Sequence, residues 1–213
     1  MNIVQTIRKT TRNYRDHGLG ITVSKASRRL ISFAYERRIY RIYRIHLDNH
    51  PVMQHDDKGF TFRLVQPEEH ELVKQIEAME EWIEGKVAEK LQSGSICLIA
   101  KKDDRMAGFN LVSFGSVFMP VVQMKRTFRP SEAWSEQITV SRNFRGKGLA
   151  TLLRYHIFDE LKNRGIKRFY GGTLLSNTPN RKLSRKVGFN GIADICYKKS
   201  IAERTWTFTR VNG

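Results

Sequence analysis

The feature that most restricts the possible folds is a long amphipathic helix predicted directly after a glycine-containing turn. Residues 149–164 place five apolar side chains on one helical face: Leu149, Leu152, Leu153, Ile157 and Leu161. Gly165 follows, and glycine suits the left-handed end of a helix. A strand predicted over residues 133–140 precedes the turn. A strand and a helix that each have an apolar face must bury those faces against other elements, which favours a layered α/β domain.

The rest of the chain after residue 58 alternates between predicted strands and helices. Strands are expected over residues 60–65, 95–101, 106–114, 169–175, 192–197 and 205–211, and helices over 68–91 and 180–186. A turn at 102–105 joins two of the strands as a hairpin. The segment 117–131, bracketed by two prolines, has no clear pattern, and loops of this kind often carry specificity for a substrate. These elements predict a mixed sheet flanked by helices over residues 58–213.

The first quarter of the chain is strongly basic. The protein has 213 residues and a formal net charge of +17, and residues 1–50 hold 11 Lys and Arg against 3 Asp and Glu (11 − 3 = +8). Residues 24–47 contain no Gly or Pro and are predicted to form a helix within a basic arm, residues 1–57. Three roles are open for this arm. It can contact an anionic membrane surface through residues 24–47, contact nucleic acid as the less favoured partner, or pack on the domain or on a second subunit of a homodimer.

The cysteines and the hydropathy pattern indicate a cytoplasmic protein. Cys97 and Cys196 lie in separate apolar runs and have no partner at metal-ligand spacing. No pair of histidines has such spacing either, so no metal is expected. No apolar run reaches the roughly 20 residues of a membrane-spanning helix, and the N-terminus lacks the apolar stretch of a secretory signal. If the arm binds lipid, the protein would lie peripherally at the inner face of the membrane.

The turn before the long helix has the chemistry of a phosphate-binding loop. Gly146 and Gly148 allow the backbone to approach an anion closely. The first amides of the helix have no intrahelical partner, and the helix dipole favours negative charge at that end. Arg145 and Lys147 add positive charge, and Thr151 adds a hydroxyl. The loop contains neither the three-glycine fingerprint of dinucleotide-binding folds nor the Gly-Lys-Ser/Thr ending of a P-loop.

The same segment resembles the acetyl-CoA-binding motif of the GNAT superfamily of N-acetyltransferases, Arg/Gln-x-x-Gly-x-Gly/Ala. Its fixed positions are filled by Arg145, Gly148 and Ala150. A second segment, which begins at Asn177 and ends at Gly188-Phe189, is similar to another common motif of the family. The resemblance covers residues 58–212. It implies a strongly bent mixed sheet and acetyl-CoA, or another acyl-CoA, as the donor of an acyl group.

The resemblance also implies which residues bind the donor. The pyrophosphate would be held by the loop and the first helical turn: Arg145, Gly146, Lys147, Gly148, Leu149, Ala150 and Thr151. The backbone of the preceding strand would pair with the pantetheine arm through Ile138, Thr139 and Val140, and Asn177 would donate or accept a hydrogen bond on the same arm.

The catalytic groups are less well defined by the resemblance. Many family members use a Tyr in the short helix to protonate the leaving thiolate, and here that position holds Ser184, whose hydroxyl is a poorer acid. Glu136 is the best candidate for the base, because strand alternation predicts that it shares a face with Ile138 and Val140. Trp134 precedes it on that face and would form a wall of a substrate pocket.

The expected reaction is transfer of an acetyl or other acyl group from CoA to the primary amine of a small-molecule or lipid-linked acceptor. Family members that acetylate protein N-termini carry a Glu on the strand that precedes Asn177, where this chain has Gly171 and Gly172, which counts against that acceptor class. The two glycines leave room for a bulky substrate or for separation of strands. Because the Tyr is absent, an alternative stays open: a non-catalytic module that binds CoA or another anion, with a basic arm for a membrane or nucleic acid.

Overall fold

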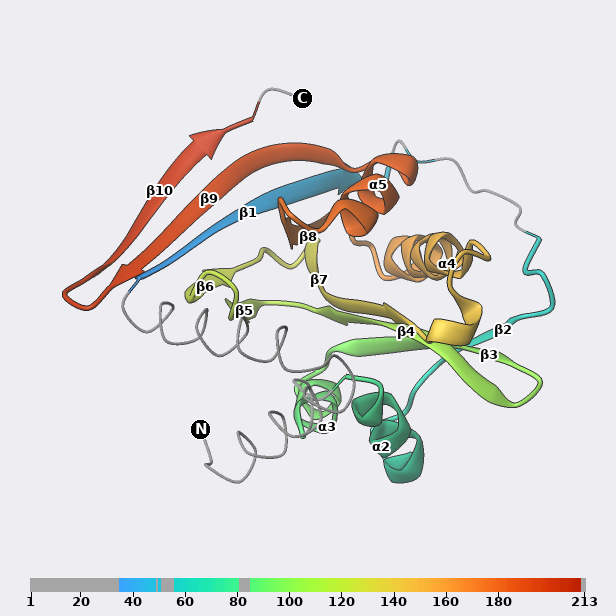
Figure 1. Cartoon of the computed structure of the whole chain (residues 1–213). Helices are drawn as coiled ribbons and strands as arrows, with labels where there is room; N and C mark the ends of the chain where they lie inside the picture. The colour runs from blue at the N-terminus through green and yellow to red at the C-terminus, as the bar shows by residue number, and fades with distance from the viewer. Residues whose placement is uncertain (1–34, 49, 51–55, 81–84, 212–213) are drawn as a thin grey trace.

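The computed structural model of the protein describes residues 35–48, 50, 56–80 and 85–211. Within these residues a single large sheet has the strand order β10-β9-β1-β8-β7-β4-β3-β2 (Figure 1). The strands are β1 Tyr35–His46, β2 Thr61–Leu64, β3 Ile96–Lys102, β4 Arg105–Ser113, β7 Glu132–Val140, β8 Arg168–Leu174, β9 Asn190–Ser200 and β10 Arg204–Arg210. All neighbours pair antiparallel except β7 and β8, which run parallel.

Helices cover both faces of the sheet. They are α2 His70–Ala78, α3 Lys86–Gln92, α4 Leu149–Asn163 and α5 Thr178–Lys186. Side chains of β3 alternate between the two sides: Leu98 packs in the cluster that contains α4, whereas Ile99 packs in the cluster that contains α2 and α3. The predicted mixed sheet flanked by helices is therefore confirmed.

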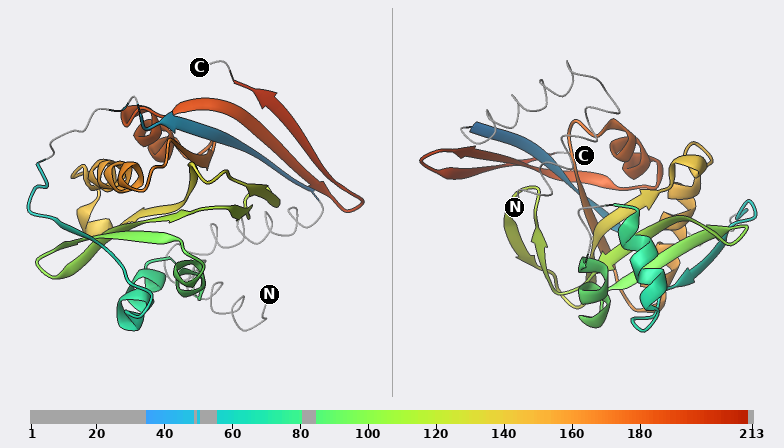
Figure 2. Two further views of the ribbon diagram at one scale, coloured as in Figure 1. Left: turned by 180° about the vertical axis from the view of Figure 1, so that it is seen from behind. Right: turned by 60° about the horizontal axis from the view of Figure 1, so that its bottom comes forward.

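The sheet is strongly bent. Strands β10, β9 and β1 form one limb, which curves away from the limb formed by β4, β3 and β2, and α4 lies in the angle between them (Figures 1 and 2). A cluster of phenylalanines fills this angle: the ring centroid of Phe158 lies 6.0 Å from that of Phe169 and 5.9 Å from that of Phe189. Each ring contributes about 1.5–3 kcal/mol when fully buried, so this cluster anchors α4 against the bend.

Several local predictions are confirmed. Asp103 and Asp104 have positive φ angles of 50° and 57°, as expected for the tight turn between β3 and β4. Gly165 has a φ of 75° and ends α4. The segment without a clear pattern forms a separate hairpin of β5 Ser116–Met119 and β6 Met124–Thr127.

The helix predicted over residues 24–47 is wrong for residues 35–46, which form β1. This strand pairs with β8 on one side and with β9 on the other, so it belongs to the middle of the sheet. Its first half buries Tyr40 and Ile42 on one face, and its second half buries Tyr43 and Ile45 on the opposite face. Because the buried face changes along the strand, the sequence shows no simple alternation. The arm upstream, residues 1–34, lies outside the described residues.

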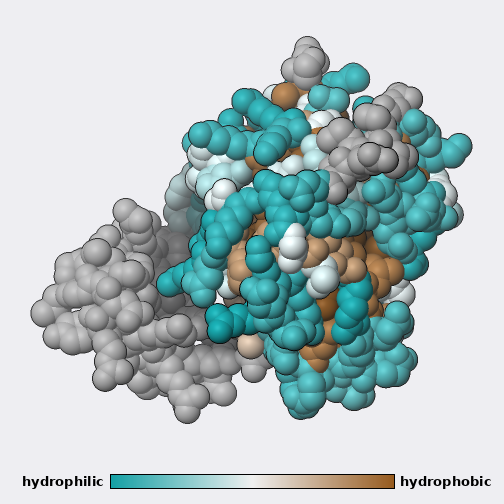
Figure 3. Space-filling view, turned by 90° about the vertical axis from the view of Figure 1, so that its right-hand side faces the viewer, coloured by the Kyte–Doolittle hydropathy of each residue, from teal (hydrophilic) through white to brown (hydrophobic). Residues whose placement is uncertain are grey.

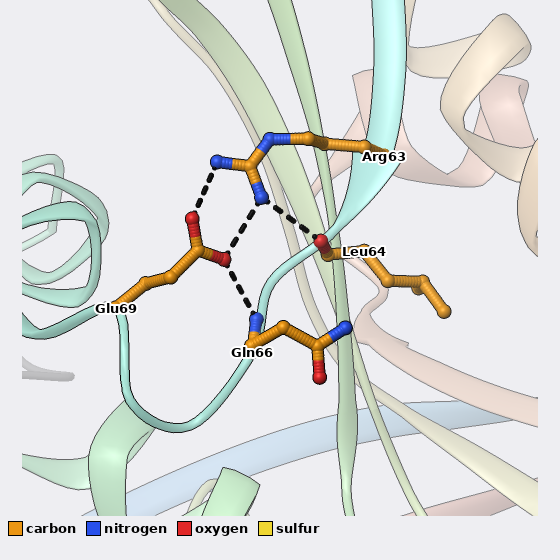
Figure 4. A network of polar contacts seen from close by, with 4 residues as sticks. All are labelled: Arg63, Leu64, Gln66 and Glu69. Carbon is orange, nitrogen blue, oxygen red and sulfur yellow. Dashed lines mark hydrogen bonds and ion pairs between the residues drawn. The ribbon is translucent and has the colours of Figure 1, made fainter.

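A cluster of polar contacts ties β2 to the start of α2 (Figure 4). The guanidinium of Arg63 donates to both carboxylate oxygens of Glu69, at 2.6 and 2.8 Å, and to the carbonyl of Leu64. The amide of Gln66 also donates to Glu69, at 2.8 Å. These bonds lower the pKa of Glu69 to about 2, with the bonds from Arg63 as the main cause.

On the side of the molecule shown in Figure 3, hydrophobic residues are exposed in the middle and hydrophilic residues surround them. Throughout the part of the chain that the structure describes, no helix has the length and the hydrophobicity needed to cross a membrane.

Candidate functional site

The predicted phosphate loop connects β7 to α4 through a short 3-10 turn, Arg142–Phe144. Gly146 and Gly148 have φ angles of 77° and 83°, a conformation that side chains other than glycine rarely adopt. Arg145 donates through its Nε to the carbonyl of Val140, at 3.0 Å, and so holds the loop against the end of the strand. The loop therefore has a defined shape, in which one of its two cationic side chains bonds to the backbone.

The start of α4 presents backbone amides toward the loop. Leu149 is 1% exposed because its side chain packs in the core, so only its main chain can face a ligand. The amide of Thr151 is bonded to the carbonyl of Gly148, at 2.9 Å. Nζ of Lys147 lies 5.3 Å from the ring centroid of Phe144. These positions fit an anion at the amides before Thr151.

Lys58, which the sequence analysis did not single out, adds a further charge. A Cβ built on Gly148 would lie 3.5 Å from Nζ of Lys58, so this ammonium stands beside the loop. Lys102 donates to the carbonyl of Lys58, at 3.1 Å, and holds that turn in place.

Strands β7 and β8 pair only at the start of β7 and separate before the loop is reached. They form three residue pairs, the last being Trp134 with Tyr170. From there β7 pairs only with β4, and β8 pairs only with β1. The edge of β7 that faces β8 is therefore open over Ile138, Thr139 and Val140, as the pantetheine prediction requires.

A groove of about 300 Å³ follows this open edge from the loop toward α5. It is lined by Glu80, Ile138, Thr139, Val140, Arg145, Ala150, Asn177, Pro179, Asn180 and Leu183. Asn177 caps α5, because its Oδ1 accepts from the amide of Asn180 at 3.2 Å. Oδ1 of Asn180 is buried and has no partner among the described residues. A buried acceptor without a donor at a groove indicates that a ligand supplies one.

A second cavity, of about 370 Å³, adjoins the groove. The two share Ile138, Asn177 and Asn180. The cavity is also lined by side chains from β1, β7, β8 and the hairpin, among them Tyr40, Trp134, Glu136 and Met119. A ligand in the groove can therefore meet a second ligand in the cavity near Ile138.

Glu136 lies in the cavity but not on the predicted face. Leu111 pairs with Gln137 and Val112 pairs with Ser135, so Glu136 is the extra residue of a β-bulge. Its carboxylate bonds to Nζ of Lys90 on α3, at 2.5 Å, whereas Ile138 packs on the α4 side. The prediction that Glu136 shares a face with Ile138 and Val140 is therefore wrong, because the bulge shifts the alternation.

Tyr40 brings a hydroxyl into the same cavity, and the sequence analysis missed it because it expected a helix there. Its ring occupies the space beside Gly172: a Cβ on Gly172 would lie 2.2 Å from Cε1 of Tyr40. Burial, and then the charge of Glu136, raise the pKa of Tyr40. The phenol therefore keeps its proton at neutral pH.

Ser184 is 8% exposed, and its hydroxyl donates to the carbonyl of Asn180 at 2.9 Å. It is absent from the residues that line the groove and the cavity. A bond to the preceding turn is the usual arrangement of a serine inside a helix. The geometry therefore favours Tyr40 over Ser184 as a proton donor.

The two cysteines and the possible metal ligands are the remaining candidates from the sequence. Cys97 is a buried free thiol and Cys196 is a half-buried one. Among the residues that the structure describes, no group of three or more His, Cys, Asp or Glu side chains is arranged to hold a metal ion.

Comparisons with known proteins agree with this geometry. The model of the acetyltransferase (GNAT) family matches residues 39–189. No curated protein matches the chain in sequence. Among solved structures, a GCN5-related N-acetyltransferase from Sphaerobacter thermophilus is 19% identical, with a TM-score of 0.56 over 84% of this chain and 56% of its own.

Two further structures have the same fold. A putative GNAT acetyltransferase from Novosphingobium aromaticivorans is 18% identical, with a TM-score of 0.52 over 84% of this chain and 69% of its own. A glucosamine N-acetyltransferase region of a fungal multi-domain β-N-acetylglucosaminidase is 14% identical, with a TM-score of 0.59 over 81% of this chain and 22% of its own. This chain thus spans little more than half of the Sphaerobacter protein. The family match extends from β1 to Phe189 and includes the loop and the groove, and the chain therefore belongs to the acetyltransferase (GNAT) family.

Proposed function

We propose that the protein transfers an acetyl or other acyl group from CoA to the primary amine of a small-molecule or lipid-linked acceptor. The observation that carries the proposal is the junction of the groove and the cavity at Ile138, Asn177 and Asn180. The groove begins at an anion-binding helix end, and the cavity contains a carboxylate. This order suits a donor and an acceptor that meet at one point.

The groove fits the shape and chemistry of CoA. Gly146 has no atom within 4 Å of a built Cβ, so the loop has room for a pyrophosphate. Lys58 and Lys147 would neutralise its charge, and the unpaired Oδ1 of Asn180 would accept from a pantetheine amide. The open edge of β7 would supply main-chain bonds to the arm. When bound, the thioester supplies the activated acyl group.

Glu136 is the proposed general base. Its side chain is 13% exposed and is held by Lys90, so the carboxylate has a fixed position in the cavity. It would accept a proton from the acceptor amine as the nitrogen attacks the acyl carbon. A C–N bond forms and the C–S bond breaks.

Tyr40 is the proposed acid. Its hydroxyl would give a proton to the sulfur of the leaving group. The proton held by Glu136 restores the phenol, so the products are an amide and a free thiol and no proton is gained or lost. The raised pKa keeps the phenol of Tyr40 protonated until the C–S bond breaks, and it also makes the phenol a weaker acid than that of a free tyrosine.

The hairpin β5–β6 closes one side of the acceptor cavity through Met119, Pro120 and Val121. Arg38 donates to the carbonyl of Val121 at 3.0 Å, and Trp206 donates to that of Val122 at 2.7 Å. The hairpin is therefore held in place by side chains of β1 and β10. A cavity of about 370 Å³ fits a compact amine or the amine-bearing end of a larger molecule.

Calorimetry and a thiol-release assay test the proposal together. We expect micromolar binding of CoA and acetyl-CoA, and release of free thiol from acetyl-CoA with at least one member of a panel of primary amines. Tyr40→Phe should slow thiol release and leave CoA affinity unchanged. Binding of CoA without turnover on any amine would instead support a non-catalytic module, and no binding of CoA would overturn the proposal.

A further inference from the structure

Arg154 is a buried cation that the transfer reaction described above does not use. It lies on α4 and is 5% exposed. Its Nη1 donates to Oγ of Ser135 at 2.7 Å, and its Cζ lies 5.6 Å from the ring centroids of Phe169 and Phe189. Ser135 is the first residue of β7 after the pairing with β8 ends. The guanidinium therefore reaches the point where the two strands separate.

The charge of Arg154 lacks a counter-ion. Among the described residues no carboxylate forms an ion pair with it, and the hydroxyl of Ser135 is its one hydrogen-bond acceptor. A guanidinium has several donors in a fork that matches a carboxylate, and it keeps its charge in proteins. Burial lowers the pKa of Arg154 to about 10, so it remains a cation at neutral pH. A buried unpaired charge is costly, and this cost is offset when a ligand brings an anion.

The guanidinium also lines the acceptor cavity, together with Glu136 and Ile138. The other charged side chains that line the cavity already have partners, because Glu136 pairs with Lys90 and Arg38 pairs with Glu36. One guanidinium balances one negative charge. A carboxylate meets this condition, whereas a doubly charged phosphate does not.

We propose that Arg154 binds a carboxylate carried by one of the two substrates, at the end of the cavity where β7 and β8 separate. This inference rests on the proposed acyl transfer. The carboxylate can belong to the acyl group of the donor, as in a dicarboxylic acyl-CoA, or to the acceptor, as in an amino acid. In both cases Arg154 determines specificity and takes no part in proton transfer.

The test compares the wild-type protein with Arg154→Met, which keeps the length of the side chain and removes the charge. In the donor arm, calorimetry measures the affinity for succinyl-CoA and for acetyl-CoA. In the acceptor arm, calorimetry measures the affinity of the CoA-bound protein for two pairs of amines with and without a carboxylate. The pairs are 4-aminobutyrate with butylamine, and phenylalanine with phenethylamine. In one arm the wild-type protein should prefer the carboxylate-bearing ligand by about tenfold, and Arg154→Met should lose that preference.

CoA itself is the control, because its binding through the groove should be the same in both proteins. If the wild-type protein does not bind CoA, the proposed function is overturned. The acceptor arm, repeated without CoA, then tests the carboxylate site by itself. If neither arm shows a preference that depends on Arg154, the inference is overturned.

Thermal unfolding gives a second readout: a purely structural Arg154 predicts a less stable Arg154→Met protein. A ligand-binding Arg154 predicts equal or higher stability without ligand. Arg154→Lys, which keeps the charge but loses the fork, replaces Arg154→Met if that variant does not fold, and should also lose the preference.

Discussion

The ring of Tyr40 occupies the volume that a side chain at Gly172 would fill. A Cβ on Gly172 would lie 2.2 Å from Cε1, 2.6 Å from Cζ and 2.7 Å from the hydroxyl oxygen of Tyr40. The neighbouring glycine differs, since a Cβ on Gly171 would meet Cβ of Ser135 at 3.6 Å, an ordinary contact. Gly172 is thus required by the ring of Tyr40 on the neighbouring strand β1, and Gly171 is not.

This relationship predicts different outcomes for two adjacent substitutions. Gly172→Ala should displace Tyr40, lower stability by about 1–3 kcal/mol and slow acyl transfer. Gly171→Ala should change stability by less and leave turnover near that of the wild-type protein. Chemical denaturation and thiol release measure both. Equal effects of the two variants would contradict the assignment of Tyr40 to the cavity.

The two left-handed glycines at the ends of α4 provide a matched pair. Gly148→Ala and Gly165→Ala should each lower stability by about 1–2 kcal/mol, because both positions have positive φ. Only Gly148→Ala should weaken the binding of CoA, because its methyl group lies at the phosphate loop beside Lys58. Titration of CoA into both variants distinguishes backbone strain from loss of the binding surface. A similar loss of affinity in Gly165→Ala would show that strain alone is responsible.

Lys58 should contribute to donor binding through its charge. Lys58→Ala is expected to weaken CoA binding by about three- to tenfold, and the loss should shrink at high salt because exposed charges are screened. Lys74→Ala, an exposed lysine that pairs with Glu71 on α2, is the control and should have no effect. An unchanged affinity in Lys58→Ala would place this ammonium away from the phosphates.

Glu136 should act on turnover and not on donor binding. Glu136→Gln removes the proton acceptor and keeps the shape, so kcat should fall by about 10²–10⁴-fold while CoA affinity is retained. Lys90→Met should give an intermediate loss, because the carboxylate remains but is no longer held in place. Full turnover by Glu136→Gln would transfer the role of base to another group or to water.

The Arg63–Glu69 pair predicts a small dependence of stability on acid. The folded pKa of Glu69, about 2, is lower than the unfolded value near 4.3. Its contribution is therefore fully present above pH 4.3 and is lost as the pH falls through about 2. Because the side chains are 48% and 31% exposed, the effect should be about 0.2–1 kcal/mol. Denaturation of Glu69→Gln and Arg63→Met as a function of pH measures it, and the stability of both variants should change less between pH 4.3 and 2.

The phosphate loop and α4 were predictable from sequence because their signals are local. Glycines with positive φ, an apolar helical face and a terminal glycine all lie within a few residues of one another. Asn180 carries a similar local signal, since it lies one helical turn after Asn177 at the edge of the groove. Short stretches of the chain therefore already contain many of the residues that line the groove.

The cavity proposed for the acceptor was not predictable in the same way, because its residues come from distant segments. Tyr40 depends on the pairing of β1 with β8, and the position of Glu136 depends on a bulge that exists only relative to β4. Arg154 was hidden in a helix whose apolar face accounted for the pattern. Registers and bulges are properties of pairs of strands, and a single sequence does not show them.

The central place of β1 also determines when the protein can complete its fold. Arg41 of β1 makes two hydrogen bonds with Asp194 of β9, 153 residues later in the chain. During synthesis, the strand that carries Arg38 and Tyr40 leaves the ribosome before β8 and β9, the two strands with which it pairs. Its two edges stay unpaired until those strands have been made, which leaves β1 open to capture by a chaperone or to aggregation. The cavity lined by Tyr40 and Glu136 is therefore assembled only after β8 has been made.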